Sequence, residues 1–156
     1  MQGQYAKAED FLKRALAFRQ LKLGPSHPDL SMTLALLGDL YFRTGHFGQA
    51  QDYYRQAIRL IEAEPVEFNT RIARLLYSLS VAYRAAGQQG DADFSLGEAA
   101  AIALNNLNKH DMATIVEEYS RELEKEGKTK QASDLRNAVK RSRAASSLVI
   151  DAFGRF

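Results

Sequence analysis

A glycine recurs along this chain at nearly constant spacing, and that repeat limits the available folds more than any other feature. Successive glycines lie 42, 42 and 40 residues apart, and an alanine follows each of them five residues later. A second alanine or a valine comes seven residues after that. The three sets are Gly3, Gly45, Gly87 and Gly127; Ala8, Ala50, Ala92 and Ala132; and Ala15, Ala57, Ala99 and Val139. Self-similarity at such a period is typical of stacked structural units.

An apolar stripe precedes each of the last three glycines. Its members are spaced i, i+3, i+4 and i+7, which places them on one face of an α-helix, and the third member is always small. The stripes are Leu34, Leu37, Gly38 and Tyr41; Leu76, Leu79, Ser80 and Tyr83; and Val116, Tyr119, Ser120 and Leu123. We therefore expect each unit to be a helical hairpin. The glycine ends the first helix in a left-handed conformation, and small residues let the second helix pack closely on the first.

The composition also favours an all-α fold. Alanine (23) and leucine (19) together exceed a quarter of the chain, whereas valine, isoleucine and threonine total only 16. Proline is costly inside a helix, and the three prolines, Pro25, Pro28 and Pro65, fall between the expected hairpins. The predicted helices span residues 4–22, 29–44, 47–63, 68–86, 89–104, 111–126 and 129–147.

These glycine, alanine and stripe positions resemble the tetratricopeptide repeat over roughly residues 3 to 140. The resemblance implies an α–α superhelix, that is, a solenoid of about three helical hairpins with an N-terminal half repeat and a C-terminal capping helix. The predicted repeat domain covers residues 1–147 and is followed by a tail. Its parts are a half repeat at 1–24, repeats at about 29–64, 68–107 and 111–147, and the tail at 148–156.

The long period and the connector at residues 23–29 look like the kinesin light chain type of this repeat. That connector carries a leucine–glycine pair, a proline and a histidine–proline pair, as in the subfamily. The positions at which the subfamily tends to carry paired asparagines hold other residues here, for example Ala35 and Leu36. We therefore carry over the architecture and not the kinesin-linked role.

In the tetratricopeptide repeat family the first helix of each hairpin lines a concave groove, so the resemblance implies a groove that binds a peptide or a helix of a partner protein. Its predicted lining grades from apolar, through aromatic and cationic, to mixed charge, which suits a peptide with a hydrophobic anchor followed by an acidic stretch. The predicted groove residues are Met32, Leu36, Asp39, Phe42, Arg43, Arg74, Tyr77, Ser78, Val81, Arg84, Glu117, Glu118 and Arg121.

The two ends of the repeat raise further expectations. The N-terminal half repeat presents Phe11, Leu12 and Phe18, which a preceding helix would normally cover. We expect the chain to be part of a longer repeat protein; the alternative function is a scaffold, a homo-oligomer assembled through this terminal hairpin. Basic residues lie along the last helix, which we interpret as a capping helix with a solvated basic face and a frayed tail. The alternatives are a tail that folds into the groove and a patch that contacts an acidic partner.

Several function classes are disfavoured. The net charge is only +2, which argues against a nucleic-acid partner, and the absence of cysteine excludes thiolate chemistry. The histidines His27, His46 and His110 lie in separate turns and connectors, so we expect no metal or other cofactor. The acidic residues between 117 and 126 alternate with basic ones and are interpreted as a solvated helix face. We expect a non-catalytic, cytoplasmic protein that does not bind membranes, since no apolar run approaches ~18 residues.

Overall fold

The computed structural model describes residues 2–62, 69–107 and 111–153, and these residues form seven α-helices and no strand. The helices are α1 (Gln2–Leu23), α2 (Leu30–Arg43), α3 (Phe47–Ile61), α4 (Asn69–Ala85), α5 (Gln89–Leu104), α6 (Met112–Lys125) and α7 (Thr129–Phe153). The predicted limits at 63, 64 and 68, residues 108–110 and tail residues 154–156 lie outside the described residues. The other predicted helix ends agree to within two residues, except the last.

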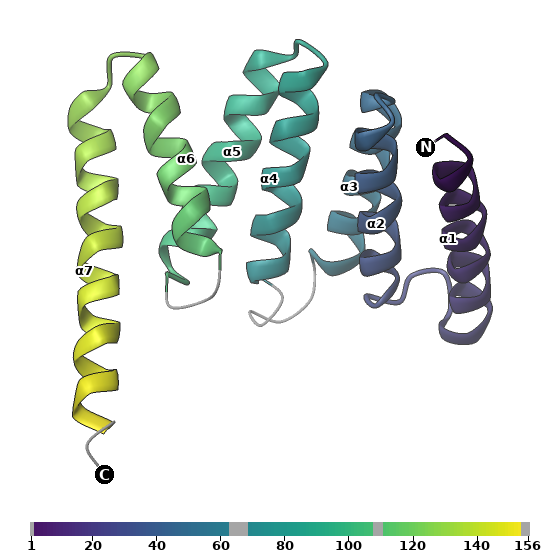
Figure 1. Ribbon diagram of the computed structural model, residues 1–156, viewed down its shortest axis with the longest axis horizontal. Coiled ribbons are helices and arrows are strands. Elements are labelled where there is room, and N and C mark those ends of the chain that lie inside the picture. Colours follow the sequence, from purple (N-terminus) through teal and green to yellow (C-terminus); the bar gives the residue numbers. More distant parts are fainter. Residues whose placement is uncertain (1, 63–68, 108–110, 154–156) are drawn as a thin grey trace.

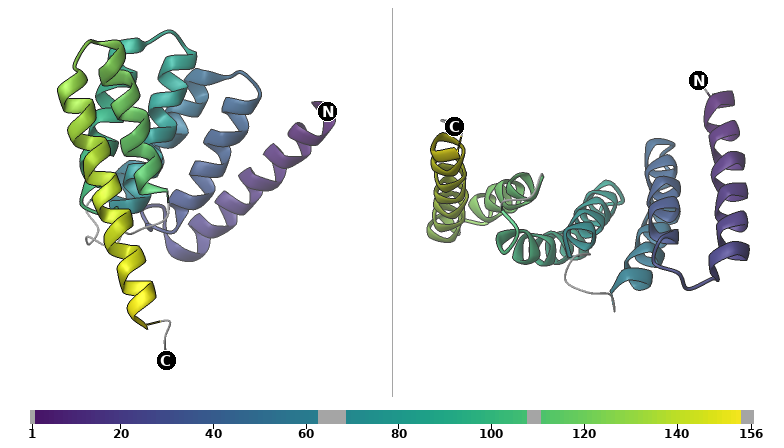
Figure 2. Two further views of the ribbon diagram at one scale, coloured as in Figure 1. Left: turned by 60° about the vertical axis from the view of Figure 1, so that its left-hand side comes forward. Right: turned by 90° about the horizontal axis from the view of Figure 1, so that it is seen from below.

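The helices stand side by side in a row and do not gather around one centre (Figure 1). Each helix packs mainly on the next one along the chain, and α4 also touches α6. The hairpins are α2–α3, α4–α5 and α6–α7, and α1 packs beside α2. Seen from below, the row of helices follows an arc (Figure 2). The predicted all-α solenoid is confirmed.

The three hairpin turns share one backbone geometry. Gly45, Gly87 and Gly127 have φ of 80°, 79° and 79°, in the left-handed region that glycine adopts without a Cβ clash. The residue after each glycine donates its N–H to a carbonyl five residues earlier, for example His46 to Tyr41 at 2.8 Å. This bond satisfies a carbonyl that the end of the helix would leave unpaired. Gly3, the first glycine of the repeat, lies instead in the first turn of α1.

The predicted small residues do lie where two helices meet. A Cβ on Gly38 would be 2.6 Å from Cε1 of Tyr54, so the ring of Tyr54 occupies the space that any larger residue on α2 would need. Ser80 and Ser120 are buried at the equivalent positions, and their hydroxyls donate to the carbonyls of Tyr77 (2.7 Å) and Val116 (2.8 Å). A buried serine at such a position is therefore satisfied by its own helix.

Two hydrophobic clusters form the core. The first joins α2, α3 and α4, and the second joins α4 through α7. The alanines spaced seven apart on the second helices are fully buried in or beside these clusters, as at Ala50 and Ala57, and Ala92 and Ala99. Because α4 contributes to both clusters, it connects the two halves of the array.

Helix α1 is attached to the array by polar and apolar contacts. Glu9 accepts hydrogen bonds from Lys13 and from the hydroxyl of Tyr41, both at 2.6 Å, and these bonds lower the pKa of the Glu9 carboxyl. Leu12 and Leu16 pack against the first core cluster. The expectation that Leu12 belongs to a bare face is therefore wrong. It lies on the side of α1 that faces the core, whereas Phe11 points away from it.

Helix α7 is longer than predicted. It continues to Phe153, six residues past the expected end at 147, and so includes most of the predicted tail. No glycine or proline interrupts residues 129–153, and Gly154 follows directly. Nothing in the local sequence ends the helix earlier. Its last turns extend beyond the neighbouring helices (Figure 1).

The close approach of α2 and α3 gives a testable expectation. Replacing Gly38 by alanine should lower the free energy of unfolding by about 1–3 kcal/mol, because the new methyl group meets the buried ring of Tyr54. Urea denaturation measures this difference.

Gly97 supplies the matched control. It is also helical, but the nearest atom to a Cβ there is the hydroxyl oxygen of Tyr119 at 3.5 Å. Gly97→Ala should therefore be neutral, or stabilising by up to about 1 kcal/mol through helix propensity. Equal effects of the two substitutions would contradict the close packing of Gly38.

Candidate functional site

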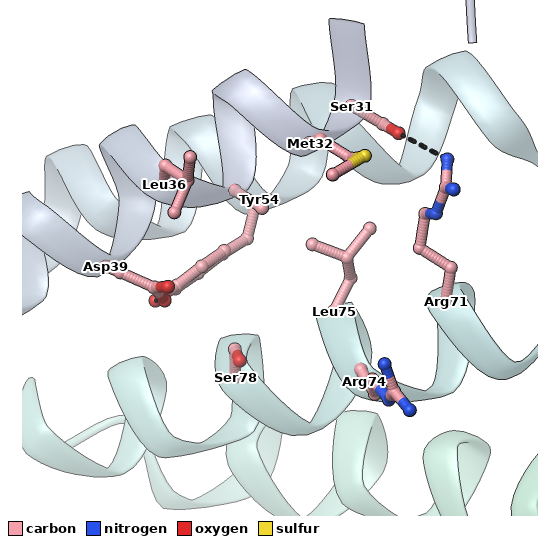
Figure 3. Close-up of a pocket in the computed structure, with 10 residues that line it drawn as sticks. Ser31, Met32, Leu36, Asp39, Tyr54, Arg71, Arg74, Leu75 and Ser78 are labelled. Carbon is pink, nitrogen blue, oxygen red and sulfur yellow. Dashed lines mark hydrogen bonds between the residues drawn. The ribbon is translucent and has the colours of Figure 1, made fainter. Parts of the chain in front are cut away.

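Two adjoining pockets lie between α2 and α4, with volumes of about 460 and 350 Å³. They share Asp39, Tyr54 and Ser78, so they form one continuous hollow, which we call the α2–α4 groove. The first pocket is lined by Ser31, Met32, Ala35, Leu36, Asp39, Tyr54, Arg71, Arg74, Leu75 and Ser78. The second adds Phe42, Arg43, Tyr77 and Val81. Figure 3 shows the first pocket, with the α2 side chains facing those of α4.

The apolar part of the groove comes from a second stripe on α2. Met32, Leu36, Asp39 and Arg43 follow each other at spacings of four, three and four residues, so they share a helix face distinct from the core face. Met32 and Leu36 are 53% and 51% exposed although both are large and apolar. Across from them lies Leu75 of α4, which is buried in the core (Figure 3). The first pocket thus has exposed apolar walls.

The charged part of the groove is predominantly basic. Arg43, Arg71 and Arg74 line it together with one acid, Asp39. Arg71 donates to Ser31 Oγ at 3.3 Å, and Arg74 lies 3.7 Å from the carboxylate of Asp111 at the start of α6. The Asp39 carboxylate accepts a hydrogen bond of 2.7 Å from the Tyr54 hydroxyl. Burial, and then this bond, raise the pKa of Tyr54 well above its usual range, so its hydroxyl stays protonated.

The second pocket is aromatic. Phe42 of α2 and Tyr77 and Val81 of α4 line it and are only partly buried. Burial, followed by the charge of Glu118, raises the pKa of Tyr77. Tyr77 therefore presents an uncharged ring and hydroxyl at physiological pH.

The groove prediction is only partly reflected in the pocket geometry. Nine of its thirteen residues line the two pockets between α2 and α4. Glu117 and Arg121 line a separate pocket of about 310 Å³ between α6 and α7, and Arg84 and Glu118 line none of the described pockets. The sequence analysis assigned the groove lining to the first helix of each hairpin, so it missed Tyr54, which lies on the second helix α3. It also missed Arg71 of α4. Because Gly38 has no side chain, the Tyr54 ring can lie against the backbone of α2 and reach the groove.

An ion pair between Arg84 of α4 and the buried Glu122 of α6 joins these two helices. Glu122 of α6 is only 8% exposed, and its carboxylate lies 3.2 Å from Arg84 and 2.9 Å from Lys125. The interpretation of residues 117–126 as an entirely solvated face is wrong at this position. Glu122 lies seven residues after Ile115 and three after Tyr119, within the buried stripe of α6. This spacing is the feature of the sequence that could have predicted the burial of Glu122.

Two basic residues of α7, Arg136 and Arg143, pair with acidic residues of α6. Arg136 makes two contacts with the carboxylate of Glu124, one of them at 2.6 Å, and Arg143 lies 3.0 Å from Glu117. Arg121 forms a further pair with Glu118 within α6. Glu124 and Glu117 of α6 thus pair with two of the basic residues that the sequence places on the last helix.

Two general searches of the described residues complete the description of the site. In residues 2–62, 69–107 and 111–153, no three histidine, aspartate or glutamate side chains come close enough together to hold a metal ion. None of the helices described there combines the length and apolar character that crossing a membrane requires.

The family model described as tetratricopeptide repeat matches residues 1–63, which include α1, α2 and α3. Residues 1–63 are therefore tetratricopeptide repeat sequence. A search of curated proteins found no match. Tetratricopeptide repeats generally mediate protein–protein interactions as non-catalytic modules, on the curved surfaces that stacked hairpins create. The kinesin light chain subtype stays a prediction.

The buried Glu122 gives a second testable expectation. Glu122→Gln should lower the free energy of unfolding by about 1–3 kcal/mol, because Arg84 loses its carboxylate partner while partly buried. Atoms Nε and Nη2 of Arg84 already have no hydrogen-bond partner among the described residues. Urea denaturation in low and high salt measures the loss.

Glu126→Gln is the matched control on the same helix end. Glu126 is exposed and pairs only with exposed Lys128 at 2.8 Å, so the substitution should leave the free energy of unfolding nearly unchanged. Equal losses in the two variants would show that the Arg84–Glu122 contact does not stabilise the packing of α4 on α6.

Proposed function

We propose that the α2–α4 groove binds an extended segment or a helix of a partner protein. The observation that carries this proposal is the juxtaposition of Met32 and Leu36, half exposed and apolar, with Arg71 and Arg74 across the same pocket. An apolar hollow with a few converging polar groups is the usual form of a binding site. The volume of about 460 Å³ also falls in the range of pockets that hold small ligands.

The apolar walls supply the attractive part of this interaction. Complete burial of a leucine or methionine side chain contributes about 1.5–3 kcal/mol, so a ligand that covers the exposed half of Met32 and Leu36 gains roughly 1 kcal/mol from each. Leu75 already forms part of the core and provides a fixed surface below them. One large apolar side chain of the ligand is therefore the natural anchor for the first pocket.

The charges favour an acidic ligand. Three arginines and one aspartate line the groove, so cations outnumber anions there, and Arg74 also lies 3.7 Å from the carboxylate of Asp111. Complementary charge increases the rate of encounter and disfavours basic competitors. A peptide with an apolar anchor followed by an acidic stretch fits both the walls and the arginines.

The groove lining also supports a non-catalytic role. A serine nucleophile needs a neighbouring base, but the partner of Ser31 is the guanidinium of Arg71, which cannot accept a proton. Among the described lining residues there is no histidine. The groove therefore offers contacts for binding, and its one carboxylate, Asp39, accepts a hydrogen bond from the Tyr54 hydroxyl.

The test uses a peptide selected from a random display library against the wild-type protein. Leu36→Asp should weaken binding of that peptide by about tenfold or more, because it places a charge in the apolar wall. Phe94→Asp is the matched control, since Phe94 is 68% exposed on α5 and lines none of the described pockets. Fluorescence anisotropy measures both affinities.

Two further substitutions extend the test along the groove. Arg74→Glu and Tyr77→Ala should each weaken the same peptide while leaving far-UV helicity unchanged, because both side chains are at least partly exposed. If these variants and Leu36→Asp all bind as tightly as the wild-type protein, the α2–α4 groove is not the binding site.

A further inference from the structure

The two pockets of the α2–α4 groove differ in chemical character. The first has aliphatic walls, for example Leu36 and Leu75, whereas Phe42 and Tyr77 make the second aromatic. The Phe42 ring lies beside the ring of Phe47 at the start of α3, with centroids 5.5 Å apart, so a second ring supports this aromatic wall. A ligand that covers the whole groove can therefore place one apolar side chain in each pocket.

The pockets follow one another along the two helices. Leu36 lies six residues before Phe42 on α2, and Leu75 lies six residues before Val81 on α4. At a rise of about 1.5 Å per residue, each of these pairs spans about 9 Å along its helix. An extended peptide advances about 3.3 Å per residue and covers this distance in two or three residues. A helical ligand would need anchors about seven residues apart to keep both on one side.

Asp39 lies between the two pockets and lines both of them. Its side chain is exposed, and its carboxylate accepts a hydrogen bond of 2.7 Å from the Tyr54 hydroxyl (Figure 3). Burial and this bond raise the pKa of Tyr54, so Tyr54 stays the donor. A carboxylate has two acceptor oxygens and donates no hydrogen bond. Asp39 can therefore accept a further hydrogen bond, and it favours a donor at the middle of the groove.

An extended segment supplies such a donor from its own backbone. Its N–H groups are not used within the segment, whereas a helix pairs its N–H groups internally. An acidic side chain at this place would be repelled by Asp39. The cations lie toward the ends of the groove, because Arg71 and Arg74 precede Leu75 on α4 and Arg43 is the last residue of α2. Acidic residues of the ligand therefore belong outside its two anchors.

We propose that the α2–α4 groove binds an extended segment of a partner protein through two apolar anchors, an aliphatic side chain in the first pocket and an aromatic one in the second, with a backbone N–H between them donating to Asp39. This inference rests on the proposed function and specifies its ligand. Aromatic rings of ligand and protein attract one another beyond simple burial, which suits the second anchor to Phe42 and Tyr77. Asp39 sets the specificity, because it excludes an acidic side chain between the anchors.

The first test examines the peptides selected from a random display library against the wild-type protein. They should carry an aliphatic and an aromatic residue two or three positions apart, with acidic residues outside this pair. Peptides whose affinity Leu36→Asp does not change would reject the proposed function itself. Peptides that Leu36→Asp weakens but that have a single apolar anchor, or anchors about seven residues apart, overturn only the two-anchor proposal.

The second test uses the sign of the effect of Asp39→Asn on one selected peptide. The asparagine carbonyl still accepts from Tyr54, but the ligand loses a charged acceptor, so fluorescence anisotropy should show about tenfold weaker binding. If Asp39 only repels an acidic ligand, the substitution tightens binding. Tighter or unchanged binding overturns the proposal. Asp52→Asn is the matched control, because it removes the same charge from an exposed position on α3 that lines none of the described pockets.

A double-mutant cycle tests the second anchor. Val81→Asp should weaken the selected peptide by about tenfold or more. A peptide with alanine in place of its aromatic residue should lose most of this sensitivity and keep its sensitivity to Leu36→Asp. Equal effects of Val81→Asp on the two peptides show that the aromatic residue lies elsewhere and overturn the proposal. Circular dichroism confirms that each variant remains folded.

Discussion

A small residue is buried on the first helix of each hairpin, and at Gly38 the ring of Tyr54 comes within 2.6 Å of the place where a Cβ would be. Protein interiors are packed densely enough that one added methyl group has a measurable cost. The approach of α2 and α3 therefore depends on the missing side chain at position 38. The missing side chain also shapes the α2–α4 groove, because the Tyr54 ring extends between the helices and its hydroxyl donates to Asp39 in the groove.

Helix α2 shows how one helix serves both packing and binding. Its core face carries Leu34, Leu37 and Tyr41, and a second face carries Met32 and Leu36 in the groove. A single helix of a globular protein usually has one apolar stripe and a polar remainder. A second, half-exposed apolar stripe adds little to the packing within the chain, which is why we place the ligand there.

In the C-terminal half of the array, ion pairs join neighbouring helices as well as residues of one helix. The acidic α6 and the basic α7 neutralise each other through the pairs Glu124–Arg136 and Glu117–Arg143. Glu122 faces the other way and reaches Arg84 of α4. Removal of water strengthens such a contact but also makes an unpaired partner costly. These pairs connect α4, α6 and α7 in the C-terminal half of the array.

The sequence by itself determined the helices, the turns and most of the core. Helix ends are local: a glycine with positive φ, or a proline between hairpins, acts on its immediate neighbours, and a spacing of three or four residues defines a buried face. It missed the end of α7 only because no local signal stops that helix before Gly154.

Only the tertiary structure decided which side chains meet between helices. The entry of Tyr54 into the groove, the burial of Glu122 beside Arg84 and the core position of Leu12 each depend on the distance and rotation of a helix far along the chain. Periodicity assigns a residue to a face of its own helix, but it does not say how near the next helix lies. That distance is set by packing of side chains from several helices at once, so it becomes fixed only when the whole array is assembled.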